Sequence, residues 1–202
     1  GNVAVGNDTM YYNQGGSYNV AVGNAANQVG AAGSRNVHIG QEAGEYNAGT
    51  LITAVGNQAG EGISGNTNAG SYSVFVGAYA GQEINTGQVN TFLGYGAGQE
   101  VTTGGKNTLV GRYDGNSGGI DIRTASNNIV ISDGDGVVGF HNVVNTGSVF
   151  GHVDVTRNAS TGNQILVGGG ATVNLFSSGN AFSGIFLIND FTATGTVCLV
   201  MT

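Results

Sequence analysis

The sequence predicts an all-β fold: a repetitive β-roll or β-prism shaft that associates as a trimer, followed by a β-sandwich or β-prism tip. The first observation behind this prediction is a short apolar segment ending in Gly, which recurs seven times at nearly constant spacing. The second is composition, because 39 of 202 residues are Gly, none is Pro and only 8% are charged. A hydrophobic content of 40% argues against disorder. Together these features indicate a tightly wound β protein.

Each repeated segment is five residues long and is typical of one short strand. The copies read NVAVG (twice), NVHIG, ITAVG, SVFVG, NTFLG and NTLVG, and their last glycines are Gly6, Gly23, Gly40, Gly56, Gly77, Gly94 and Gly111. The spacings are 17, 17, 16, 21, 17 and 17 residues. Helical repeats need about 33 residues or more. Each unit therefore predicts one coil of a β-roll.

Side chains of a strand alternate between two faces, so the pattern also predicts an interior. The second and fourth positions hold Val, Ile, Leu or Thr in every copy, for example Val74 and Val76. We expect these positions to face inward, so that Asp at Val76 or Leu93 would unfold the rod. The third position would then face outward, and its change from Ala to Phe and Leu in the later coils suggests a contact between chains.

A second motif, G-x-x-A-G, follows the strand in the later units. It spans residues 40–44, 56–60, 77–81 and 94–98, and Asp114 replaces the Ala in 111–115. Glycines four residues apart around an Ala predict a corner with close backbone packing or positive φ. A thin rod of such coils has little core, and association of several copies around one axis would supply more burial.

The repeats stop after Gly115, and residues 123–136 read as a last strand with a tight turn. All eight Tyr precede residue 114, whereas six of eight Phe follow residue 139. The sequence therefore predicts a shaft over residues 1–136 and a tip over 137–202, where short apolar runs separated by turns favour a sandwich or prism. Gly1 begins inside a repeat unit and Thr202 follows an apolar run directly, so we expect a fragment truncated at the tip.

Charge excludes several classes of partner. The formal net charge is −7, and the five basic residues are scattered singly. Without a basic patch we expect no nucleic-acid binding, and an anionic membrane would repel the chain. The longest apolar run has five residues, so no membrane insertion is expected.

The blocks at residues 90–111 and 126–136 resemble the repeat and repeat terminator of tail-fibre proteins of tailed bacteriophages, especially those of aquatic bacteria. The resemblance implies a homotrimer in the virion, attached to other tail proteins, whose tip binds a host cell-surface glycan or outer-membrane receptor. The NVAVG units are also similar to the head repeats of trimeric autotransporter adhesins on bacterial cell surfaces. A monomeric ice-binding β-solenoid is a further alternative, which the lack of a repeated Thr-x-Thr ladder disfavours.

Loops of the tip are the expected place for receptor contacts, because binding residues concentrate on loops held by a rigid scaffold. The candidates are Thr156, Arg157, Asn158, Ser160, Asn163, Ser177, Ser178 and Asn180. Tyr79, Tyr95 and Tyr113 recur at the corners of the shaft. We interpret them as caps on the coil edge rather than platforms for sugars.

Neither a metal, a cofactor nor catalysis is expected. Asp133 and Asp135 could bind calcium, but a hairpin turn explains the DGDG sequence better. His141 or His152 could place three imidazoles on a trimer axis, whereas His38 falls on the outward third position. The carboxylates recur once per coil, as Glu42, Glu61, Glu83 and Glu100, which indicates a solvated edge. Asp154 and Asp190 in the tip have no recognisable partner, so the sequence predicts no enzyme.

Overall fold

The computed structural model describes residues 1–29, 33–65, 70–144, 184–190 and 195–201. The chain divides into two compact units, Gly1–Thr156 and Arg157–Thr202. Every regular element in the described residues is a β-strand, which confirms the predicted all-β fold class. None of these residues forms a helix long and apolar enough to cross a membrane.

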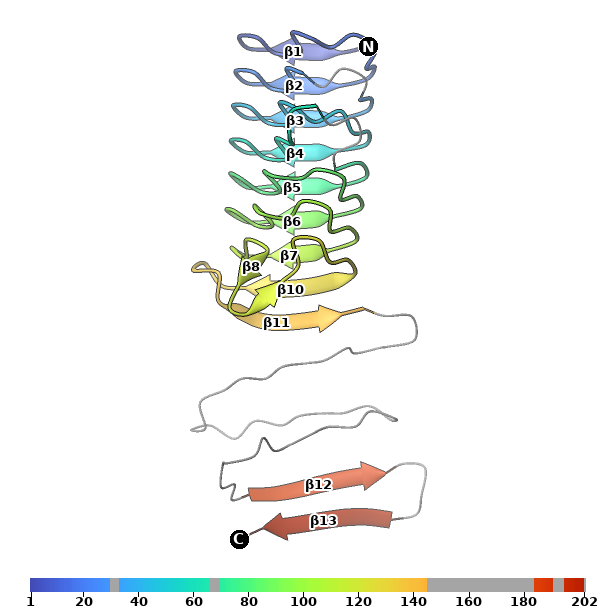
Figure 1. The fold of residues 1–202 in the computed structure, drawn as a ribbon, viewed down its shortest axis with the longest axis vertical. Coiled ribbons are helices and arrows are strands. Elements are labelled where there is room, and N and C mark those ends of the chain that lie inside the picture. The colour runs from blue at the N-terminus through green and yellow to red at the C-terminus, as the bar shows by residue number, and fades with distance from the viewer. Residues whose placement is uncertain (30–32, 66–69, 145–183, 191–194, 202) are drawn as a thin grey trace. The chain divides into compact units, whose positions relative to one another are not determined.

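The first unit is a parallel β-solenoid of about seven turns (Figure 1). One three-residue strand comes from each coil: β1 (Val3–Val5), β2 (Val20–Val22), β3 (Val37–Ile39), β4 (Thr53–Val55), β5 (Val74–Val76), β6 (Thr91–Leu93) and β7 (Thr108–Val110). Equivalent positions pair in register, so Val20 lies beside Val37, and Thr53 pairs with Val74 despite the longer spacing there. The repeat predicted from the sequence is confirmed.

The parallel array ends with longer strands. A small hairpin of β8 (Asn116–Ser117) and β9 (Ile120–Asp121) precedes β10 (Asn128–Ser132), which pairs in parallel with β7. Strand β11 (Val138–Val143) is antiparallel to β10 and lies at the end of the nine-stranded sheet. Residue 136, where the sequence predicts a domain boundary, lies in the turn between them. That boundary stays a prediction.

In the second unit, the described residues form one antiparallel pair, β12 (Gly184–Asp190) and β13 (Gly195–Met201). The predicted sandwich or prism tip otherwise falls outside the described residues.

The corners form as the G-x-x-A-G motif predicts. Gly98 has a φ of 61°, and a Cβ there would lie 2.5 Å from the ring of Phe92. The preceding Ala97 is fully buried. Gly94, at the start of the same motif, has a φ of 134° and lies directly against the next coil. Backbone packs on backbone at each corner, which keeps the coils at the spacing of parallel strands.

The predicted interior of the strands is wrong, because the two faces are exchanged. Third-position side chains fill the core: Ala21, His38, Ala54, Phe75, Phe92 and Leu109 are all 0% exposed. The second and fourth positions lie on the outer surface, where Leu93 is 48% and Val74 is 39% exposed. The physical reason lies in the first position, where a buried Asn fixes the alternation so that positions one and three face inward.

Those buried asparagines form a ladder that runs along the solenoid. The side-chain carbonyl of Asn90 accepts from the backbone N–H of Asn107 at 2.9 Å, and its amide donates to the carbonyl of Gly104 at 2.9 Å. Asn19, Asn36 and Asn107 repeat both contacts with their own neighbours. The Asn side chains therefore satisfy backbone groups that a narrow coil would otherwise bury unpaired.

Candidate functional site

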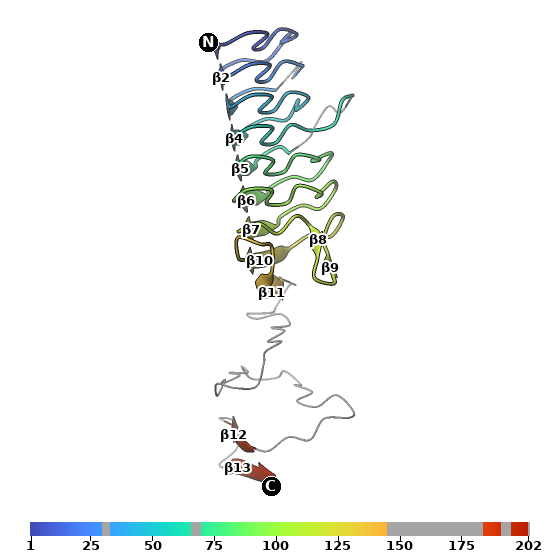
Figure 2. The same cartoon turned by 90° about the vertical axis from the view of Figure 1, so that its left-hand side faces the viewer.

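The outer surface of the solenoid strands is the most distinctive surface of the described residues. Two straight columns of side chains cover it, and we name these sixteen residues the ladder face. They are Val3, Val20, Val37, Thr53, Val74, Thr91, Thr108 and Ile129 in one column, and Val5, Val22, Ile39, Val55, Val76, Leu93, Val110 and Ile131 in the other. None of the sixteen carries a charge. Figure 2 shows the strands aligned along one side of the coils, with the turns on the other sides.

The apolar side chains of the ladder face are exposed to an unusual extent, although the chain as a whole is acidic, with a net charge of −7. Val5 is 56%, Ile131 48% and Val110 38% exposed. Contiguous apolar patches of more than a few hundred Å² are uncommon on monomeric proteins and mark interaction sites. The arrangement can therefore bury a flat apolar surface against another flat surface.

The edge of the face at the start of the strands carries further exposed apolar residues. Tyr18, Leu51, Tyr72 and Val89 each directly precede the buried first position of a strand, and they are 46–66% exposed. All four have φ near +60°. Sequence reasoning missed these residues because side chains larger than Gly or Asn rarely take this conformation.

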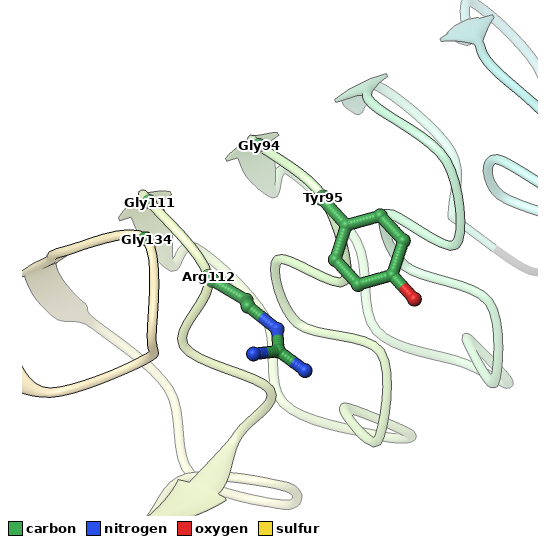
Figure 3. A pocket seen from close by; sticks show the side chains of 5 residues that line it. All are labelled: Gly94, Tyr95, Gly111, Arg112 and Gly134. Carbon is green, nitrogen blue, oxygen red and sulfur yellow. The ribbon is translucent and has the colours of Figure 1, made fainter.

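On another side of the coils, an aromatic column ends at an arginine. The rings of Tyr79 and Tyr95 meet edge to face with centroids 5.7 Å apart, and the Arg112 guanidinium lies 5.4 Å from the Tyr95 centroid. Figure 3 shows Tyr95 and Arg112 beside the column of Gly94, Gly111 and Gly134, which line a depression of about 440 Å³. These contacts run from coil to coil, as expected of residues that cap the coil edge, and the interpretation of Tyr79 and Tyr95 as caps rather than sugar platforms stays a prediction.

Tyr113 also belongs to the coil itself. Its ring is buried and its hydroxyl donates to the carbonyl of Ile120 at 2.6 Å. Burial raises the pKa of Tyr113 above its ordinary value, so the hydroxyl stays neutral. It fixes the small β8–β9 hairpin onto the last coil.

Two of the four coil-edge carboxylates, Glu42 and Glu61, join a ladder of glutamine amides. Gln58 donates to Glu42 at 2.7 Å, and Gln82 donates to Glu61 at 3.0 Å and to the side-chain carbonyl of Gln58 at 3.2 Å. Burial, more than the nearby Glu45 and Glu42 charges, raises the pKa of Glu61. Hydrogen bonds between neighbouring coils account for these groups.

Two of the candidate metal ligands, Asp133 and His141, have other partners. Asp133 accepts from the backbone N–H groups of Asp135 and Val137, both at 2.9 Å, as expected of a turn. His141 lies 3.0 Å from the side-chain oxygen of Asn128. Within the described ranges, no three His, Cys, Asp or Glu side chains gather closely enough to hold a metal ion. His152 lies outside these ranges, as do Thr156, Arg157, Asn158, Ser160, Asn163, Ser177, Ser178 and Asn180.

His38 is a correction, since it lies inside the coil and not on the outer surface. Its ring is 0% exposed, stacks between Ala21 and Ala54 in the third-position column, and neither ring nitrogen has a hydrogen-bond partner. Burial lowers the pKa of His38 from 6.5 to about 4. The folded chain therefore holds a neutral imidazole at neutral pH.

This burial predicts a pH-dependent stability. Between the unfolded pKa of 6.5 and the folded pKa of about 4, the unfolded chain binds the proton and the folded chain does not. Stability from this group is present above pH 6.5 and falls by up to about 3 kcal/mol as the pH decreases to 4. His38→Leu, which copies Leu109 of the same column, should flatten the profile. Denaturant unfolding of both proteins from pH 4 to 8 measures the difference, and parallel profiles would contradict it.

Geometry and sequence together define the class of fold as a parallel β-solenoid with an exposed apolar face. Comparisons of the chain with known protein families, curated proteins and solved structures found no significant match.

Proposed function

We propose that the chain is a structural attachment protein: the trimeric shaft of a bacteriophage tail fibre, with its receptor-binding tip at residues 137–202. The observation that carries the proposal is the uncharged ladder face, left exposed on an acidic solenoid. A repetitive coil has a fixed length and a straight edge, and both properties suit a spacer between a particle and a cell.

The ladder face also supports association of three copies. Each solenoid is narrow, and its core is made of third-position side chains, corner alanines and a few larger residues such as Ile84 and Val101. Burying the ladder face of each copy around a common axis would remove two columns of Val, Ile and Leu from water, at about 25 cal/mol for each Å² of apolar surface buried. A trimeric adhesin head on a bacterial surface would use the same arrangement.

Cell attachment is the direct test of this function. We expect labelled full-length protein to bind cells or purified surface polysaccharide of a panel of aquatic bacteria. The triple variant Thr156→Ala, Arg157→Ala, Asn158→Ala should lose this binding, whereas Glu83→Gln on the exposed coil edge should keep it. Retained binding by the triple variant would contradict a receptor site in these tip loops, and failure of the unmodified protein to bind any cell would contradict the attachment function.

A monomeric ice-binding solenoid is a second candidate, and one observation favours it. The flat ladder face presents Val, Ile and Thr in two straight columns at the spacing of parallel strands, although only Thr53, Thr91 and Thr108 supply hydroxyls. A single-chain native mass together with inhibition of ice recrystallisation would select this function over the fibre.

A further inference from the structure

Seven exposed residues at the edge of the ladder face share an unfavourable backbone conformation. We name them the left-handed column: Tyr18, Arg35, Leu51, Tyr72, Val89, Lys106 and Asn127, with φ between 59° and 66°. A hydrogen bond to the preceding coil fixes this geometry. The N–H of Val89 donates to the carbonyl of Ser71 at 3.0 Å, and that of Lys106 donates to Gln88 at 2.8 Å.

Side chains in this column work against the stability of a single chain. The left-handed conformation costs about 1–2 kcal/mol for a residue with a Cβ, and a β-branched residue such as Val89 is a marked outlier there. Glycine takes this conformation at other corners of the same coils, as at Gly44 and Gly98. Glu42, Gln58 and Tyr79 also take it, but their side chains contact the neighbouring coils. Tyr18, Leu51, Tyr72 and Val89 are nevertheless large and apolar, and at 46–66% exposure they gain little burial from their own coil.

We propose that the left-handed column is a contact surface for a second copy of this chain, whose ladder face its apolar side chains cover. The inference rests on the proposed trimer. In a cyclic trimer the two sides of each interface differ, so the edge of one copy meets the face of the next. Strained backbone persists where the surrounding structure makes use of it, and contact with a neighbouring copy supplies the burial that the single coil lacks.

The size of the ladder face supports this surface. Eight strands at ~4.8 Å spacing and three residues at ~3.3 Å each give a projected area of about 380 Å². A stable interface buries about 800 Å² on each partner. The ladder columns alone are therefore narrow for a stable contact, and the apolar side chains at their edge widen the surface.

The distribution of charge also favours a second copy of the chain as the partner of the left-handed column. Copies of net charge −7 repel one another. The ladder face carries no charge, so two copies can meet there without placing like charges against each other. Arg35 and Lys106 are the charged members of the column, and both are basic, so the column brings no carboxylate to the contact. A second copy can therefore meet this face and edge without bringing carboxylates together.

The experiment separates strain from association by substituting Asn, which tolerates the left-handed conformation. Leu51→Asn, Tyr72→Asn and Val89→Asn are combined in the full-length chain, and native mass is followed over a dilution series. We expect unchanged β-sheet circular dichroism and dissociation at a concentration about 1,000-fold higher than for the unmodified protein, since each of the three apolar side chains removed from the interface should weaken association about tenfold. Val89→Asn alone should raise the concentration at which the assembly dissociates about tenfold.

Lys106→Asn is the matched control, because it relieves the same strain at φ 59° and removes no apolar side chain. Its dissociation should match that of the unmodified protein. The inference is overturned if the triple variant and Val89→Asn dissociate at the same concentration as the unmodified protein. If Leu93→Asp on the ladder face still dissociates the assembly in that case, the proposed trimer stands and only the role of the column fails. A monomeric unmodified protein would overturn both.

Discussion

Gly94→Ala is expected to lower the free energy of unfolding of the solenoid by about 3–5 kcal/mol, a loss in the range of the largest single substitutions. A Cβ at Gly94 would lie 2.2 Å from the carbonyl oxygen of Gly111 and 2.9 Å from its carbon. Both are backbone atoms of the next coil, so no side chain can move aside to make room. The φ of 134° at this residue is also strained for Ala. The stack must open between β6 and β7.

Gly134→Ala provides the control, because a Cβ there meets no atom within 4 Å. Its stability should stay within about 0.5 kcal/mol of the unmodified protein. Denaturant unfolding followed by circular dichroism compares the two variants. Equal midpoints for Gly94→Ala and Gly134→Ala would show that neighbouring coils do not approach as closely at their corners as the structure has them.

Asn90→Ala should be similarly damaging, at about 2–5 kcal/mol, for a different reason. Removing the side chain leaves the N–H of Asn107 and the carbonyl of Gly104 without their side-chain partner. A buried backbone group left unpaired costs about 1–3 kcal/mol. Because each coil contacts only its neighbours, the defect separates the stack into two shorter arrays.

Asn90→Ser offers a graded comparison taken from the chain itself. Ser73 occupies the equivalent position one coil earlier, and its hydroxyl accepts from the N–H of Asn90 at 2.9 Å. Ser at position 90 should therefore regain the bond from Asn107 but not the bond to Gly104, and its stability should fall between the Asn and Ala proteins. Thermal unfolding that ranks Ser no better than Ala would contradict a ladder built on side-chain acceptors.

Much of the fold follows from spacing and glycine. Seven copies of one segment predict seven stacked strands, and Gly94 and Gly98 predict a corner where backbone lies on backbone. Sequence alone does not settle which face of the strands is interior, because a run such as Val74-Phe75-Val76 is apolar on both faces and a period of two fits either assignment. The asparagines at the first position, such as Asn90 and Asn107, decide which face is inside, because they are buried and hydrogen-bonded. Positions one and three of a strand share a face, so Phe92 is inside as well.

The candidate surface could be predicted only in part. The sequence indicates an apolar ladder and association of copies, but the same pattern led us to expect Val76 and Leu93 in the core, with Asp at either position causing unfolding. In the structure these residues lie on the ladder face, so Asp there should disturb association more than folding. The left-handed column has no sequence signature at all, since Leu51 and Val89 are residue types that rarely adopt positive φ.

Native mass by size exclusion with light scattering shows whether the ladder face is buried between copies of the chain. We expect a mass close to three times the 20.2 kDa of one chain. Leu93→Asp, at a residue 48% exposed in the single chain, should give a single-chain mass with its β-sheet circular dichroism retained. A single-chain mass for the unmodified protein at every concentration would contradict burial of the ladder face between copies, as would a Leu93→Asp protein that keeps the mass of three chains.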